Sequence, residues 1–68
     1  MNDHVYRIIE VVGSSKNSIQ DAIEIGITRA RKNLRNVDWF EVEETRGGLD
    51  GDTIYYQVVL KVGFRLED

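Results

Sequence analysis

The sequence of 68 residues contains no cysteine and no proline. Without cysteine the chain can form no disulfide and offers no thiolate to a metal ion, and its single histidine, His4, gives little support to a metal site. No apolar run is long enough to span a membrane, so we expect no membrane partner. No charged segment followed by an apolar one opens the chain, so we also expect no secretory signal and a cytoplasmic protein.

Neither sign of charge predominates, because the formal net charge is only −3. This balance and the scattered basic residues disfavour nucleic acid as a partner. Hydrophobic residues make up 41% of the chain, which is too many for a disordered protein. The length predicts one domain over residues 1–68. A domain of this size buries only about 60% of its unfolded surface, so oligomerisation is the expected source of further stability.

The first half of the chain predicts a strand and then a helix. Residues 4–12 are rich in β-branched side chains and are followed by Gly13, which is typical of a strand that ends in a turn. We expect Ser15 to cap a helix that begins near Lys16, with Ser14 and Ser18 as alternative caps. Apolar or small residues then recur every three or four positions and define one helix face. They are Ile19, Ala22, Ile23, Gly26, Ile27, Ala30 and Leu34.

The second half predicts two further strands. One runs over residues 37–46, residues 47–52 form a hairpin loop rich in Gly and Asp, and the other strand covers residues 53–66. Alternation places one set of apolar side chains on a single face of this last strand. The set comprises Tyr56, Val58, Leu60, Val62, Phe64 and Leu66.

The predicted order is therefore strand, helix, strand, strand, in which the last two strands are antiparallel neighbours. One helix covers one face of a sheet, so its stripe should meet the face that carries Phe40, Val58 and Leu60. The opposite face carries Trp39 and Tyr55 among polar residues. Exposed aromatic side chains on an uncovered sheet face indicate a subunit contact or a ligand site.

No set of residues in the sequence predicts catalysis. There is no cysteine nucleophile, and no pocket that would shift the pKa of a general acid or base is specified by the pattern. Arg31, Lys32 and Arg35 fall in the last turns of the helix, where cations interact favourably with the helix dipole. A phosphate-binding patch is the alternative interpretation of these three residues.

One cluster does suggest binding: Trp39, Gln57, Arg46 and Tyr55. Trp39 and Gln57 have the same strand parity, and a turn near residues 48–51 would bring them close together. An indole offers a flat stacking surface, and an amide offers both a donor and an acceptor. Together they suit a planar heteroaromatic ligand. Chemistry alone favours the other interpretation, in which Trp39 packs in a subunit interface and Gln57 is solvated, because Trp is enriched at interfaces.

Several stretches resemble the dodecins, a family of small flavin-binding proteins. They are residues 5–13 (VYRIIEVVG), 30–34 (ARKNL), 38–42 (DWFEV), 46–47 (RG), 56–58 (YQV) and 61–67 (KVGFRLE). The resemblance covers nearly the whole chain and is greatest for bacterial members. It implies an α+β subunit of β-α-β-β order, in which a three-stranded antiparallel sheet is partly wrapped around one helix. It also implies that twelve subunits assemble into a hollow homododecamer.

The resemblance further implies flavin sites at subunit contacts. Two flavins would stack between symmetry-related Trp39 side chains, Gln57 would hydrogen-bond the pyrimidine edge, and Arg46 would lie near the phosphate of FMN, with Tyr55 nearby. FMN is the expected flavin, with riboflavin or FAD as alternatives. Some bacterial members also bind coenzyme A, and the matching residues here are Tyr6, Arg29 and Arg65. His4 stands at a position where such a member has a basic residue.

These features predict a protein that stores and sequesters a flavin and limits its photochemistry, and that is not an enzyme. The alternative is a structural or partner-binding oligomer, with coenzyme A as a possible ligand and flavin binding secondary. A flavoenzyme comes last, because the sequence supplies no acid, base or substrate pocket.

Overall fold

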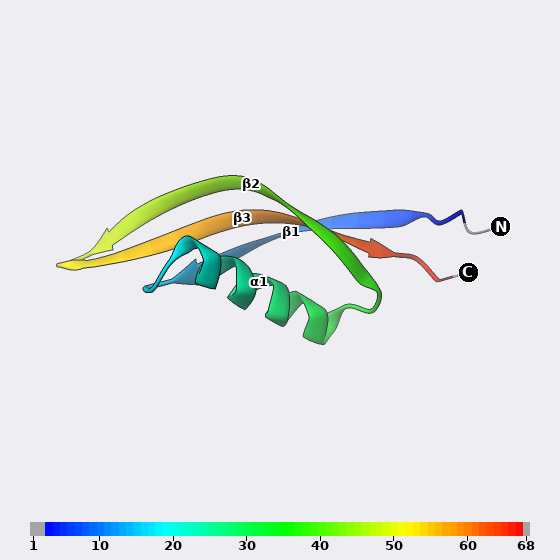
Figure 1. Ribbon diagram of the computed structural model, residues 1–68, viewed down its shortest axis with the longest axis horizontal. Helices are drawn as coiled ribbons and strands as arrows, with labels where there is room; N and C mark the ends of the chain where they lie inside the picture. The colour runs from blue at the N-terminus through cyan, green and yellow to red at the C-terminus, as the bar shows by residue number, and fades with distance from the viewer. Residues whose placement is uncertain (1–2, 68) are drawn as a thin grey trace.

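The computed structural model describes residues 3–67, so residues 1, 2 and 68 of the predicted domain lie outside the described part. It contains four elements in the predicted order (Figure 1). Strand β1 covers Tyr6–Ser15, helix α1 covers Ile19–Asn33, strand β2 covers Val37–Asp50 and strand β3 covers Thr53–Arg65. The β-α-β-β topology is thereby confirmed.

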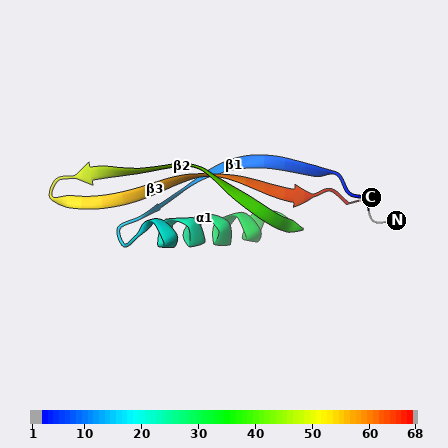
Figure 2. The ribbon, with the colours of Figure 1, turned by 45° about the horizontal axis from the view of Figure 1, so that its top comes forward.

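The three strands form one antiparallel sheet with the order β1-β3-β2, so β3 lies in the middle. Helix α1 lies against one face of this sheet, and the other face is uncovered (Figure 2). Pairing of β1 with β3 ends at Ser15 and Tyr56. Beyond that point β2 and β3 continue as a two-stranded arm, which projects past the beginning of α1 (Figure 1).

The core lies between α1 and the sheet. Val58, Leu60 and Val62 are fully buried on alternate positions of β3, as the predicted face requires. Ala22 and Ala30 are buried on the facing side of α1. Ile19, Ile23 and Ile27 of the predicted helix stripe pack around them. Ile9 and Val11 of β1 and Val37 of β2 also pack against this core.

One predicted core contact is wrong. Phe40 pairs with Val62 and so lies on the helix-facing side, but its side chain is 47% exposed. The reason is the position of α1, which lies mainly against β1 and β3 and leaves the outer strand β2 largely uncovered.

Two glycines allow α1 to approach the sheet closely. A Cβ atom on Gly13 would overlap the backbone carbonyl of Ala22, and a Cβ atom on Gly26 would lie 3.0 Å from Leu60 Cδ1. The expected close approach at Gly26 is therefore confirmed.

The predicted helix start is wrong by several residues. Ser18, one of the two alternative caps, is the N-cap, and its hydroxyl accepts a hydrogen bond of 2.9 Å from the backbone N–H of Asp21. Ser15 is still in β1, where it pairs with Tyr56, so it cannot begin the helix. Its hydroxyl instead donates to Asp21 Oδ2 at 2.6 Å and accepts from the backbone N–H of Asn17 at 2.9 Å.

The predicted hairpin loop at residues 47–52 is also wrong. Strand β2 continues to Asp50, which pairs with Thr53, so the turn consists of Gly51 and Asp52. Gly51 has a φ of +60°, which glycine adopts without steric cost. Gly47 and Gly48 are strand residues, because they pair with Tyr56 and Tyr55.

Candidate functional site

The candidate site lies on the uncovered face of the sheet. Trp39 of β2 pairs with Gly63 of β3, and Ile8 of β1 pairs with the same glycine from the other side. The indole of Trp39 lies directly over Gly63, where a Cβ atom would overlap it. Tyr6 flanks this indole, with ring centroids 6.4 Å apart and planes inclined by 56°. Trp39 is 39% exposed, so part of a large aromatic surface is available for stacking.

A second group of polar residues lies farther along the same face. Arg46 and Gln57 are cross-strand partners, and Arg46 Nε donates to Gln57 Oε1 at 2.9 Å. Arg46 Nη1 also bonds Glu44 Oε1 at 2.8 Å. The ring of Tyr55 lies over Gly48, so a flat aromatic surface borders this group as well. The structure thus brings Arg46, Gln57 and Tyr55 together, as the sequence predicts.

The expected proximity of Trp39 and Gln57 within one subunit is wrong. Both lie on the uncovered face, but the β3 partner of Trp39 is Gly63, six positions from Gln57. At about 3.3 Å per residue this separation is roughly 20 Å. The register differs from the prediction because pairing continues to Asp50 and Thr53, which moves the turn toward the C-terminus. The irregularity between Val42 and Glu44 offsets this by only one residue, so that Trp39 pairs with Gly63 and not with Phe64.

Charged residues occupy the sheet between these two groups. Lys61 pairs with Glu10 of β1 and Glu41 of β2, and its Nζ lies 3.7 Å from Glu43 Oε1. A hydrogen bond with Glu43, together with the negative charge of that residue, raises the pKa of Glu10, and Lys61 opposes the shift. This central part of the face is therefore polar, in contrast to the aromatic surface at Trp39.

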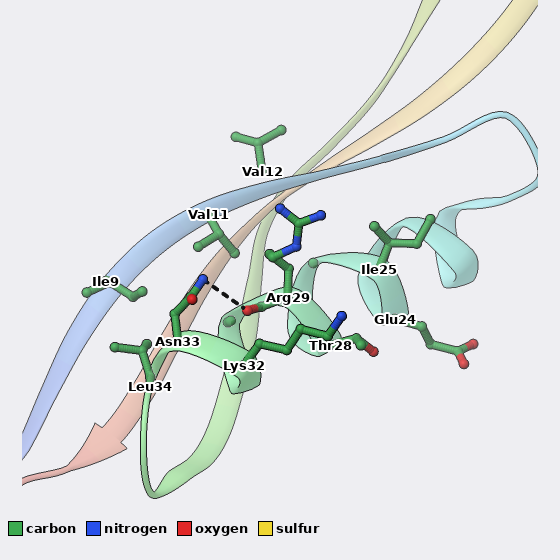
Figure 3. A pocket seen from close by; sticks show the side chains of 12 residues that line it. Ile9, Val11, Val12, Glu24, Ile25, Thr28, Arg29, Lys32, Asn33 and Leu34 are labelled. Atoms are coloured by element: carbon green, nitrogen blue, oxygen red, sulfur yellow. Dashed lines mark hydrogen bonds between the residues drawn. The ribbon is translucent and has the colours of Figure 1, made fainter.

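The three residues matched to coenzyme A contacts do not form one cluster within the subunit. Tyr6 and Arg65 are cross-strand partners, and the His4 ring lies edge-on to Tyr6 at 6.4 Å. Arg65 also lines a polar cavity of about 490 Å³ with His4, Arg35, Asn36, Leu66 and Glu67. Arg29 instead projects from α1 beside Val11 and Val12, about 16 Å along β1 from Tyr6 (Figure 3).

A groove between α1 and the edge of β1 is a feature that sequence reasoning missed (Figure 3). Its volume is about 640 Å³. The signal in the sequence was Ile25, which lies outside the predicted helix stripe and is 47% exposed. Near the end of the helix, the Asn33 side chain donates to the backbone carbonyl of Arg29 at 3.4 Å and helps to shape the groove.

Neither a metal centre nor a membrane span is found in the part of the chain that the structure describes. Within residues 3–67, no three acidic or histidine side chains are arranged to hold a metal ion. No helix over the same residues has the length and apolar character needed to cross a bilayer.

Comparison with known proteins identifies the family. The dodecin family model matches residues 5–67. A curated dodecin from Thermus thermophilus is 51% identical over 65 residues, which cover 94% of each chain. The structure of dodecin from Streptomyces davaonensis has a TM-score of 0.91 and 47% identity, covering 98% of this chain and 100% of that chain. A calcium dodecin from Mycobacterium tuberculosis with a calcium-binding site has a TM-score of 0.84 and 28% identity, covering 93% and 91% of the two chains. The chain therefore belongs to the dodecin family of small flavin-binding proteins.

Proposed function

We propose that this protein binds FMN and stores it in a form protected from photochemistry, without catalysing a reaction. The observation that carries the proposal is the partly exposed indole of Trp39, laid over Gly63 on a sheet face that α1 leaves uncovered. A planar ring can stack on such a surface. When bound, the flavin supplies a light-absorbing ring, and an adjacent indole can quench its excited state by electron transfer.

The other residues fit the remaining parts of a flavin. The Gln57 amide can donate to and accept from a pyrimidine edge, and its carbonyl oxygen is already oriented by Arg46 Nε at 2.9 Å. Arg46 is exposed and cationic, which suits the phosphate of FMN. Riboflavin lacks this phosphate, so Arg46 favours FMN over riboflavin. Tyr55, laid over Gly48, supplies an aromatic wall beside this polar group.

The separation between Trp39 and Gln57 requires more than one subunit. Gln57 and Gly63, the β3 partner of Trp39, are six positions apart, so one flavin ring cannot contact both side chains of the same chain. We therefore place each site at a contact between subunits, where flavin pairs stack between Trp39 side chains of two copies. Family membership supports a homododecamer as the assembly.

Titration with FMN, followed by flavin fluorescence and combined with sizing of the assembly, tests the proposal. We expect strong quenching that saturates near one flavin per subunit. Trp39→Ala should weaken binding by about 1–3 kcal/mol, the range for stacking of a base on an aromatic side chain. This corresponds to roughly 5- to 150-fold in the dissociation constant.

Trp39→Phe is the matched control, because it keeps an aromatic ring and should retain most of the affinity. A Trp39→Ala protein that assembles normally and binds FMN as tightly as the unchanged protein would show that the indole is not the stacking surface.

A second candidate is a structural or partner-binding oligomer that takes coenzyme A, with flavin binding secondary. The observation that favours it is the polar cavity of about 490 Å³ at the end of the sheet. His4, Arg35 and Arg65 line this cavity, and the two guanidinium groups suit a ligand that carries phosphates. Calorimetric titration with coenzyme A, with and without Arg65→Ala, tests it. Binding that requires Arg65 while FMN gives no quenching would favour this candidate over the flavin store.

A further inference from the structure

Trp39 has a second aromatic ring beside it on the uncovered face. The centroid of the Tyr6 ring lies 6.4 Å from that of the indole, and the two planes are inclined by 56°. This separation is typical of interacting aromatic pairs, whose centroids lie about 4.5–7 Å apart. The other neighbours that the register gives the indole are Gly63, beneath it, and Ile8, across β3. Of these three neighbours, only Tyr6 has a side chain that is readily oxidised.

The strands of the sheet hold the two rings together. Tyr6 is the first residue of β1 and pairs with Arg65, two positions of β3 beyond Gly63. The indole reaches Gly63 from β2, on the other side of β3. The rings therefore meet over the central strand, each coming from a different outer strand. Their separation is set by strand pairing and not by a loop, so the contact is a fixed part of the fold.

Tyr6 can return an electron to an oxidised Trp39. In the proposed quenching, the indole loses one electron to a photo-excited flavin and becomes a radical cation. At neutral pH a phenol that releases its proton is oxidised at a lower potential than an indole, so electron transfer from Tyr6 to this cation is favourable. An oxidised phenol is strongly acidic, and Tyr6 is 40% exposed, so its proton passes to water. The products are an intact Trp39, a neutral phenoxyl radical on Tyr6 and one proton.

We propose that Tyr6 is the electron donor that restores Trp39 after one-electron oxidation. The inference rests on the proposed function for its oxidant, the photo-excited flavin, and adds the residue that takes over the oxidation. The transferred electron and one proton from water then return to Tyr6 and form the phenol again, so the cycle leaves no net change. The indole spends less time as a radical that reacts with oxygen, and the stacking surface is preserved.

Pulse radiolysis of the flavin-free protein tests the electron transfer itself. In azide solution without oxygen, the azide radical serves as a one-electron oxidant for the single tryptophan of the chain. We expect the absorption of the indolyl radical to decay while that of a phenoxyl radical grows, at a first-order rate that does not depend on protein concentration. Tyr6→Phe keeps the aromatic ring and removes the oxidisable phenol, so this conversion should be lost.

Tyr55→Phe is the matched control. It removes a phenol from the same face of the sheet, but Tyr55 lies eight positions of β3 from Gly63, so the conversion should persist. The emission maximum of Trp39 checks that the indole has not moved in Tyr6→Phe. Conversion of the indolyl to a phenoxyl radical at the same rate in Tyr6→Phe as in the unchanged protein would overturn the inference.

Illumination of the FMN-loaded protein in air tests the protective consequence. At equal occupancy, Tyr6→Phe should accumulate oxidised Trp39 severalfold faster than the unchanged protein or Tyr55→Phe, as measured by mass spectrometry of peptides. Equal rates would overturn the protective role of Tyr6 and leave the flavin proposal standing. Failure of FMN to bind would overturn the proposed function instead, whereas pulse radiolysis involves no flavin and decides separately whether Tyr6 reduces Trp39.

Discussion

The side chains of the central strand β3 differ between the two faces of the sheet. On the side of α1, Val58, Leu60 and Val62 are fully buried. On the other side, the interleaved residues Gln57 and Lys61 are only partly buried and bond to side chains of β2. One face therefore stabilises the subunit, and the other holds polar and aromatic groups that can bind. Substitutions on the two faces should consequently have separable effects on stability and on binding.

The largest expected effect comes from breaking the covered face. Leu60→Ala truncates a fully buried side chain that lies where α1 comes close to the sheet at Gly26. The substitution therefore leaves a cavity in a small core. We expect the free energy of unfolding to fall by about 2–5 kcal/mol. Denaturant unfolding at one fixed protein concentration measures it.

Val12→Ala is the control for the uncovered face. Val12 is 53% exposed and pairs with Val59 on that face. Its truncation should change the free energy of unfolding, measured at the same fixed protein concentration, by no more than about 0.5 kcal/mol. Equal losses of the free energy of unfolding in Leu60→Ala and Val12→Ala would contradict the view that the covered face alone stabilises the subunit.

An intermediate effect is expected at the surface under the indole. Gly63→Ala places a methyl group where Trp39 lies, so the indole must move away from the sheet. We expect FMN affinity to fall, by at most the roughly 1–3 kcal/mol of the stacking interaction. Fluorescence titration measures the affinity, and the emission maximum of Trp39 reports the displacement.

Gly47→Ala is the matched control, because a Cβ atom there meets only the Tyr55 carbonyl oxygen at 3.5 Å, an ordinary contact. Unchanged FMN affinity and unchanged indole emission in Gly63→Ala would show that the position of the ring does not matter for binding.

The smallest effect concerns the acidic pair in the middle of the uncovered face. The pKa of Glu10 is raised, chiefly by its hydrogen bond with Glu43, so the folded state binds this proton more tightly than the unfolded state does. This contribution to stability is present at acidic pH and is lost as pH rises through the raised pKa.

Glu10→Gln keeps a donor for Glu43 and removes the ionisation. It should therefore lessen the loss of stability between mildly acidic and neutral pH. Thermal unfolding across this range measures the change, and Glu24→Gln on the exposed side of α1 serves as control. A steeper pH dependence in Glu10→Gln than in the unchanged protein would have the wrong sign for this explanation.

Local patterns predicted the covered face well. Burial every second residue in β3 and every third or fourth residue in α1 follows from strand and helix geometry, so Leu60 and Ala22 could be placed from the sequence alone. The motifs around Trp39 and Gln57 identified the family without any structure.

Register could not be predicted in the same way. Gly47 and Gly48 are typical of a turn, yet they pair within the sheet, and Gly48 accommodates the ring of Tyr55. This context is tertiary. It moves the turn to Gly51 and thereby changes the cross-strand partner of Trp39. The helix start was wrong for a related reason, because pairing with Tyr56 extends β1 to Ser15.

The distance along β3 between Trp39 and Gln57 has a consequence for how a ligand would be released. A ligand that contacts both side chains joins two chains, so its retention depends on the concentration of the protein itself. By mass action, ligand at about a hundred times its dissociation constant stabilises the bound state by about 2.7 kcal/mol. Dilution of the subunits favours their dissociation and releases the ligand together with the separated chains. The proposed flavin store would therefore hold its ligand only while the assembly persists.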